Sequence, residues 1–228
     1  MKHDFLYVIW KNPKSRKNYT VGKLTKSDGY LFEYSNEYKD AQQNGWELIK
    51  AFPEVKEYHS KELFPFFSSR LPDKKRRNIK EILKRYNLEE YDGYELLKKS
   101  GGRLPIDTYE FIDPIFLDDE VVKRDFYICG VRHTTGCKGE NCTDRPQLHV
   151  DMELLLELEP DNEHDSNAVL VKTEQGEAIG YVPRYYSKSL ATRLMRDMPY
   201  ECKVIELCKE KDCQNCIKVK LEMPRNNN

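Results

Sequence analysis

The hydrophobic and polar positions at the start of the chain predict an antiparallel meander. Apolar and aromatic residues form strand-length runs at residues 5–10, 19–24 and 30–34. The polar residues 11–18 separate the first two runs, and the turn residues 27–29 separate the second run from the third. Short connections of this kind join neighbouring antiparallel strands, so a small sheet is expected here.

The pattern then becomes helical. Asp73 is a candidate N-cap for a helix over residues 75–86, and a second helix is expected over residues 91–99. The glycines 101–102 end the second helix, and a strand over residues 107–112 follows. The helix positions expected to face inward are Ile79, Ile82, Leu83, Tyr94, Leu96 and Leu97.

The second half of the chain alternates short strands with polar turns. Strand-like runs occupy residues 124–131, 154–158, 168–172, 178–182, 200–207 and 217–223. The loop 161–167 contains only Asp, Asn, Glu, His and Ser residues. Because a strand fixes each end of this loop, its polar side chains are expected to cluster at the end of a sheet, as in a binding site.

One helix is expected among these strands, with Ser187 as its N-cap. Leu190 and Leu194 would then face inward. The cations expected to face outward are Lys188, Arg193 and Arg196.

A change in composition predicts the domain organisation. Pro114 and the acidic residues 118–120 interrupt the strand pattern. The expected parts are a first domain over residues 1–113, a linker over 114–123, a second domain over 124–224 and a disordered tail over 225–228. The fold class is therefore α+β, with an antiparallel sheet and helices in the first domain.

Composition and charge restrict the classes of function that the sequence is compatible with. The net charge of −1 means that binding to nucleic acid requires a local basic face. No apolar run reaches the roughly 18 residues of a membrane helix, and the N-terminus lacks a signal-peptide core, so we expect a cytoplasmic protein without membrane contact. No nucleophile–base pair and no glycine-rich phosphate loop is evident, so we expect no enzymatic activity.

Three motifs of the second half resemble the HIRAN domain. They read E-P-x-N-x-x-D-x-N-A-V from Glu159, I-G-Y-V-P from Ile179 and C-G-V-R-H from Cys129. The resemblance implies a small OB-like β-barrel, and the best-understood members of the family bind the 3′ end of single-stranded DNA. Cations for phosphates, rings for bases and a carboxylate for the terminal hydroxyl are the groups that such a ligand requires.

The resemblance also implies a role for each matching residue. Asp165 would accept the terminal hydroxyl, His164 would stack beside it, and Arg132 with its neighbour His133 would supply a cation and a ring. Tyr181 and Arg184 match positions that approach the last nucleotides. His133 and His164 stand where the family has tyrosines, and imidazole offers a smaller stacking area than phenol. The residues alone leave another interpretation open, in which Asp165 and Asn167 only cap a tight turn.

The first half carries a second resemblance. The motifs are L-Y-V-x-W from Leu6, G-K-L from Gly22, F-F-S-S-R-L-P from Phe66, Y-E-L-L from Tyr94 and G-G-R from Gly101. Together they resemble the N-terminal subdomain of HipA-type serine/threonine kinases, which in some systems is a separate small protein that restrains the kinase. No kinase core follows in this sequence. The candidate partner-binding residues are Phe64, Phe66 and Phe67, which are equally compatible with a core.

The seven cysteines suggest a metal site more than disulfides, because their number is odd and no signal peptide is present. Two closely spaced pairs are candidate ligands of one structural zinc ion: Cys137, Cys142, Cys213 and Cys216. Free loop thiols are the alternative. Cys129 and Cys202 lie on expected strands and are interpreted as small core residues. No other cofactor is expected.

A basic run lies at the expected start of the first helix. Its cations are Lys74, Lys75, Arg76, Arg77, Lys80, Lys84 and Arg85. Such a run can follow a phosphate backbone, although most runs of this kind form a solvated helix face.

These observations predict a regulatory or antitoxin-like component of a HipA-type toxin–antitoxin system. Its first domain would dock on a separately encoded HipA-type kinase, and its second would contact DNA, either the promoter of the system or a single-stranded 3′ end. Two alternatives remain open. One is a DNA 3′-end-binding protein of repair or phage defence, and the other is an interaction module whose barrel binds protein.

Overall fold

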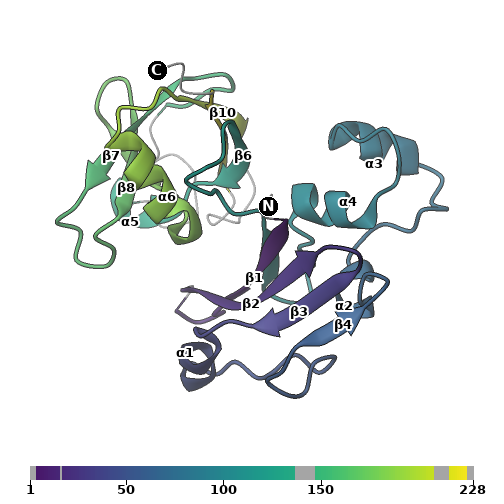
Figure 1. Ribbon diagram of the computed structural model, residues 1–228. Coiled ribbons are helices and arrows are strands. Elements are labelled where there is room, and N and C mark those ends of the chain that lie inside the picture. Colours follow the sequence, from purple (N-terminus) through teal and green to yellow (C-terminus); the bar gives the residue numbers. More distant parts are fainter. Residues whose placement is uncertain (1–3, 16, 137–146, 208–215, 225–228) are drawn as a thin grey trace. The chain divides into compact units, whose positions relative to one another are not determined.

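The computed structural model describes residues 4–15, 17–136, 147–207 and 216–224. The chain divides into two compact units, residues 1–114 and residues 115–228 (Figure 1). Each unit has its own sheet structure and is described separately below. No helix within the described ranges is both long and apolar enough to span a membrane.

Unit 1 is built on a five-stranded antiparallel sheet with the strand order β4-β3-β2-β1-β5. The strands are β1 (Phe5–Lys11), β2 (Asn18–Lys26), β3 (Tyr30–Tyr34), β4 (Tyr58–Ser60) and β5 (Tyr109–Ile112). The helices are α1 (Tyr38–Gln43), α2 (Pro65–Ser68), α3 (Ile79–Arg85) and α4 (Gly93–Ser100). The predicted meander and the later strand are confirmed.

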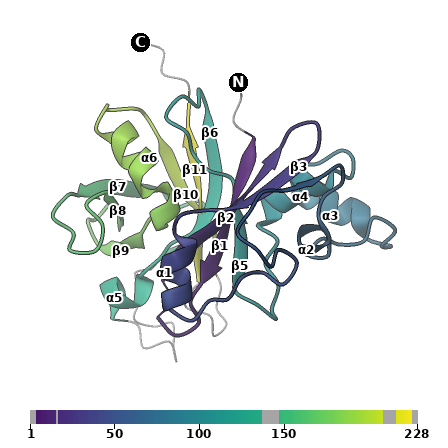
Figure 2. The same cartoon turned by 60° about the horizontal axis from the view of Figure 1, so that its bottom comes forward.

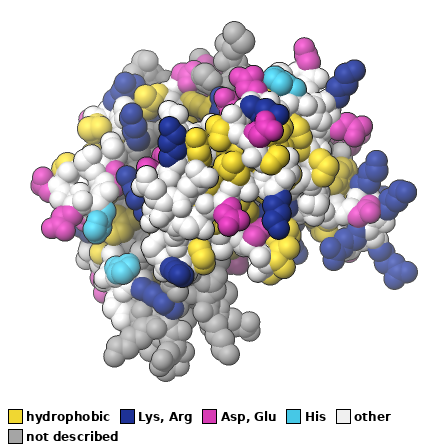
Figure 3. Space-filling model, turned by 90° about the horizontal axis from the view of Figure 1, so that it is seen from below, with side chains coloured by type: hydrophobic (Ala, Val, Ile, Leu, Met, Phe, Trp, Pro, Cys, Tyr) yellow, Lys and Arg dark blue, Asp and Glu magenta, His cyan; other side chains and the backbone are white. Residues whose placement is uncertain are grey.

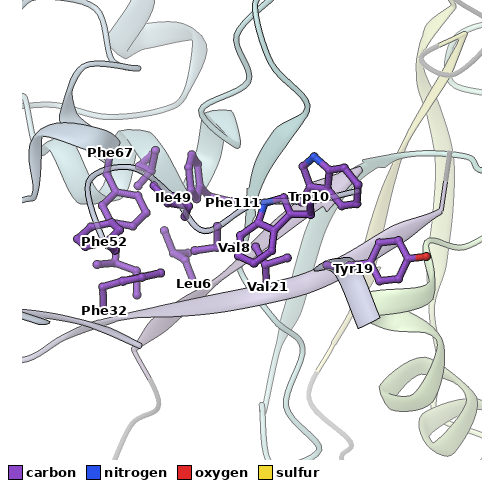
Figure 4. Packing of buried hydrophobic residues seen from close by; sticks show 14 of the residues in the cluster. Leu6, Val8, Trp10, Tyr19, Val21, Phe32, Ile49, Phe52, Phe67 and Phe111 are labelled. Atoms are coloured by element: carbon purple, nitrogen blue, oxygen red, sulfur yellow. The ribbon is translucent and has the colours of Figure 1, made fainter. Parts of the chain in front are cut away.

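An aromatic core fills one side of this sheet (Figure 4). Phe32 of β3 stacks on Phe52 with ring centroids 4.1 Å apart, and Phe67 of α2 lies 5.9 Å from both rings. Phe67 is fully buried. The close packing of these large rings explains why the aromatic cluster and the strands form one structure.

The helix predicted from residue 75 begins later, at Ile79. Asp73 caps a turn instead: its Oδ1 accepts a hydrogen bond from the Lys75 amide at 2.7 Å, and its carbonyl accepts one from the Arg76 amide at 2.9 Å. A helix starting at residue 75 would place consecutive cations at its positive N-terminal end, which is unfavourable. The second helix is confirmed, with Asp92 as a side-chain cap that the sequence did not reveal.

Unit 2 contains two three-stranded antiparallel sheets, with the orders β10-β11-β6 and β7-β8-β9. Their strands are β6 (Val122–Tyr127), β7 (Leu154–Glu159), β8 (Ala168–Thr173), β9 (Ala178–Tyr181), β10 (Glu201–Leu207) and β11 (Ile217–Met223). Two single-residue bridges join the sheets, Cys129 to Tyr181 and Glu153 to Lys203. The expected closed barrel is therefore not observed among the described residues, whose strands form two separate three-stranded sheets.

The first strand of unit 2 is shorter than the predicted run 124–131, because Gly130 turns the chain. Gly130 has φ +72°, a left-handed conformation that glycine adopts readily. The short helix α5 (Val131–Thr135) follows at once. Val131, the last residue of the predicted strand, therefore lies on a helix together with Arg132 and His133.

The helix expected after Ser187 also differs from its prediction. Helix α6 (Arg184–Leu194) begins directly after Pro183, whose fixed φ suits the entry to a helix. Ser187 is buried within it and does not cap it. Leu190 is buried as predicted, but Arg193 faces inward with only 1% of its surface exposed.

Candidate functional site

The predicted DNA-binding residues lie on segments that meet at the end of β9. Tyr181, the last residue of β9, exchanges two backbone hydrogen bonds of 2.8 Å with Cys129, just before α5. Its ring lies against Gly130, where an added Cβ would be 3.3 Å from Tyr181 Cδ2. Figure 2 shows α5 beside β9. The Thr134 hydroxyl holds α5 against β9 by donating a hydrogen bond to the carbonyl of Ile179 at 2.6 Å.

Glu159 connects Tyr181 to the polar loop. The Tyr181 hydroxyl donates to Glu159 Oε2 at 3.0 Å, and the Asn162 Nδ2 donates to the same oxygen at 3.0 Å. Burial, followed by the hydrogen bond to Glu159, raises the pKa of Tyr181 above its ordinary value. The phenol therefore stays protonated and remains a donor to the carboxylate.

The loop that follows β7 is held by its own side chains. Asn162 Oδ1 accepts from the His164 amide at 3.0 Å and from the Asp165 amide at 3.2 Å. Asp165 Oδ1 in turn accepts from the Asn167 amide at 2.9 Å. This is the turn-capping contact that the sequence left open as an alternative role for Asp165. The other carboxylate oxygen of Asp165 accepts no hydrogen bond from the described part of the chain.

The functional side chains remain accessible. Arg132, Asp165 and Tyr181 are partly exposed, while His133, His164 and Arg184 are exposed. Arg184 is the first residue of α6 and follows Tyr181 by three positions, so it lies near the same strand end. The site thus has a carboxylate side, formed by the loop, and a cationic side, formed by α5 and the start of α6.

Glu159 and Asn162 are the site residues that sequence reasoning missed. Both belong to the E-P-x-N part of the motif, so the signal was present. Their role depends on the antiparallel pairing of β7 with β8 and of β8 with β9, which brings Glu159 next to Tyr181. Sequence spacing alone does not show this contact.

The three phenylalanines proposed for partner binding do not form an exposed patch. Phe67 is fully buried in the core of unit 1, so it is not available to a partner and that prediction is wrong. Phe64 and Phe66 are partly buried against the same core. Their packing reflects the general tendency of large aromatic side chains to complete a core.

The zinc prediction falls mostly on residues that the structure does not describe. Cys137, Cys142 and Cys213 lie outside the described residues, as does Cys208. Cys216 is described and is buried at the start of the β11 segment. Cys202 is buried as expected, and burial raises the pKa of its thiol to about 12. Structural zinc therefore stays a prediction.

Comparison with known proteins identifies both halves of the chain. Residues 121–223 match the family model of the HIRAN domain, and residues 15–105 match that of the HipA N-terminal domain. The protein therefore contains a HipA N-terminal domain followed by a HIRAN domain. No protein with a curated description matches the chain significantly.

Two solved structures are similar to parts of the chain. The crystal structure of the HIRAN domain of human HLTF shares 16% identity, with a TM-score of 0.35, over 45% of this chain and 74% of that one. A protein from Lactobacillus plantarum shares 24% identity, with a TM-score of 0.36, over 46% of this chain and 99% of that one.

Proposed function

We propose that the protein is a non-catalytic regulator of a HipA-type toxin–antitoxin system that binds DNA through its HIRAN domain. The observation that carries the DNA-binding part is the hydrogen-bonded connection from Tyr181 through Glu159 to Asn162. This connection fixes the loop of His164 and Asp165 relative to the end of β9, against which the helix with Arg132 packs. The regulatory part is supported by the presence of a HipA N-terminal domain in the same chain.

The ligand of the site is a single-stranded 3′ terminus with a free hydroxyl. Arg132 and Arg184 supply cations for the last phosphates, and the exposed rings of His133 and His164 supply stacking surfaces. The loop side carries Asp165 together with other carboxylates. A carboxylate accepts a hydrogen bond from a hydroxyl group but repels a terminal phosphate.

A titration with two oligonucleotides tests this proposal. The strands have the same sequence and differ only in a 3′-hydroxyl or a 3′-phosphate terminus. We expect the hydroxyl strand to bind about tenfold or more tightly, since a hydrogen bond to a charged group contributes about 1.5–3 kcal/mol. Equal dissociation constants for the two strands, measured by fluorescence anisotropy, would contradict binding of the hydroxyl by a carboxylate.

A second candidate is a DNA-end-binding protein of repair or phage defence, in which unit 1 is only a scaffold. It is favoured by one observation: every residue of the site lies in unit 2, so binding of an end requires nothing from unit 1. Co-expression with a HipA-type kinase encoded beside the gene separates the candidates. Co-purification of the full chain with the kinase supports the regulator, and its absence supports the scaffold.

A further inference from the structure

A dense basic segment of unit 1 is not used by the proposed function. Between residues 74 and 85 the chain has seven cations and one acid, a net charge of +6, whereas the whole chain has a net charge of −1. The remaining residues therefore carry −7. All seven cations are exposed: Lys74, Lys75, Arg76, Arg77, Lys80, Lys84 and Arg85. Figure 3 shows Lys and Arg side chains gathered at the right-hand margin, on the side where Figure 1 places α3.

The cations of this basic segment have no carboxylate partners among the residues that the structure describes. None of the seven forms an ion pair with any residue in the described ranges. Other cations of unit 1 are neutralised, as shown by Lys26 with Asp92 at 3.2 Å and Lys98 with Asp113 at 3.6 Å. The positive charge of the segment is thus concentrated and directed to solvent.

The fold holds the backbone of the basic segment in place. Before it, Asp73 caps the turn that carries Lys75, and the Tyr91 hydroxyl donates to the Pro72 carbonyl at 2.9 Å. After it, the Lys99 Nζ donates to the Asn87 carbonyl at 3.2 Å. Between these contacts, Leu83 of α3 is buried. The cations therefore extend from a fixed support, which lowers the conformational cost of binding.

The chemistry of the basic segment fits phosphates better than a protein or a membrane. Protein interfaces have apolar and aromatic centres and few lysines, whereas the residues 74–85 include no exposed large apolar side chain. Helix α3 has seven residues, of which Leu83 is buried and Ile79 and Ile82 are partly buried, so it has no broad apolar face for a lipid surface. Closely spaced lysines and arginines are the groups that replace counterions along DNA.

We propose that the basic segment binds the phosphate backbone of duplex DNA and needs no strand terminus. This inference goes beyond the proposed function, in which unit 1 contacts a kinase and only unit 2 contacts DNA. It gives the chain a second DNA-binding surface, one that does not distinguish between sequences because it contacts phosphates alone.

A covalently closed duplex circle tests the inference, because it has no end for the HIRAN domain to bind. The test variant of the full chain carries K74Q, K75Q, R76Q and R77Q. The control variant carries K14Q, K39Q, K50Q and K61Q, which removes the same charge from exposed positions elsewhere in unit 1. The two tryptophans of the chain, Trp10 and Trp46, both lie in unit 1, so their fluorescence verifies that each variant is folded.

We expect the test variant to bind the circle about tenfold or more weakly at low salt, with the control within about twofold of the parent protein. The slope of log affinity against log salt should be shallower by up to about 3.6 in the test variant, since four phosphate contacts are lost and each removes about 0.9. Equal affinities of the two variants for the circle would overturn the inference, as would be found if an acidic protein were the true partner.

The outcome is independent of the proposed function. A protein that binds 3′-hydroxyl strands but not the circle would refute only the second surface. A protein that binds the circle through the basic segment but shows no preference among strand termini would refute only binding of the 3′ end.

Discussion

Replacing Arg70 by methionine is expected to destabilise unit 1 by about 3–5 kcal/mol, the usual cost of removing one partner of a buried ion pair. The Arg70 side chain is 3% exposed and pairs with Asp107 through both terminal nitrogens. Its Nε donates to the Phe66 carbonyl and its Nη1 to the Gly102 carbonyl, each at 3.2 Å. One guanidinium thus connects α2, the glycines after α4 and the residues before β5.

The unfolding of unit 1 can be followed by itself in the full chain. Trp10 and Trp46 are its only tryptophans and the only ones in the sequence, so urea titrations monitored by tryptophan fluorescence report this unit. R70K keeps the charge but not the two-pronged geometry, and we expect an intermediate loss of stability. R76M is the control, because Arg76 is exposed. A loss below about 1 kcal/mol for R70M, the range of exposed pairs, would contradict a structural role for the Arg70–Asp107 pair.

Replacing Arg193 by methionine is expected to destabilise unit 2 by about 3 kcal/mol, since each hydrogen bond to a charged group contributes about 1.5–3 kcal/mol. Arg193 of α6 donates from Nη2 to the carbonyls of Phe116 and Asp119, at 2.6 and 2.7 Å. Burial lowers the pKa of its guanidinium below the ordinary value. The contacts fix the first residues of unit 2 against its longest helix.

Cysteine labelling measures this effect, because unit 2 contains no tryptophan. Cys202 of β10 is buried and its thiol has a raised pKa, so it reacts with a thiol reagent only when the strand opens. The extent of labelling at Cys202, measured by mass spectrometry across a urea series, gives the unfolding midpoint. R196M, which alters an exposed arginine next to α6, should leave that midpoint unchanged. The same midpoint for R193M would show that the contacts with residues 116 and 119 are dispensable.

Much of the fold could be predicted because its elements have strong local signals. The meander in unit 1 follows apolar runs separated by turn residues, and α4 ends at Gly101 in the left-handed conformation that its sequence suggests. Local signals did not predict the orientation of a side chain where contacts with residues far away in the sequence determine it. Arg193 faces inward because backbone carbonyls more than 70 residues away accept its hydrogen bonds, and no periodicity of charge reveals such partners.

The candidate site also combines features that the sequence predicted with features that it did not. The motifs pointed to the segment after Cys129, the loop after β7 and the end of β9, which the structure connects through Cys129, Tyr181 and Glu159, but they did not show that a helix begins after Gly130. They also left the role of Asp165 open between ligand binding and turn capping. The structure shows that one oxygen of Asp165 caps the turn, and we propose that the other oxygen accepts from the terminal hydroxyl.

This division of roles at Asp165 permits a direct test of the central claim that the HIRAN domain binds a 3′-hydroxyl terminus. D165N keeps an oxygen that can accept from the Asn167 amide, so the turn is retained while the charge is lost. D161N removes a charge from an exposed position of the same loop and serves as the control.

The measured quantity is the ratio of affinities for otherwise identical strands with a 3′-hydroxyl and a 3′-phosphate terminus. We predict that D165N lowers this ratio about tenfold, as expected for the loss of a charged hydrogen bond, and that D161N changes it by less than about twofold. An unchanged ratio in D165N, or equal changes in both variants, would contradict the claim.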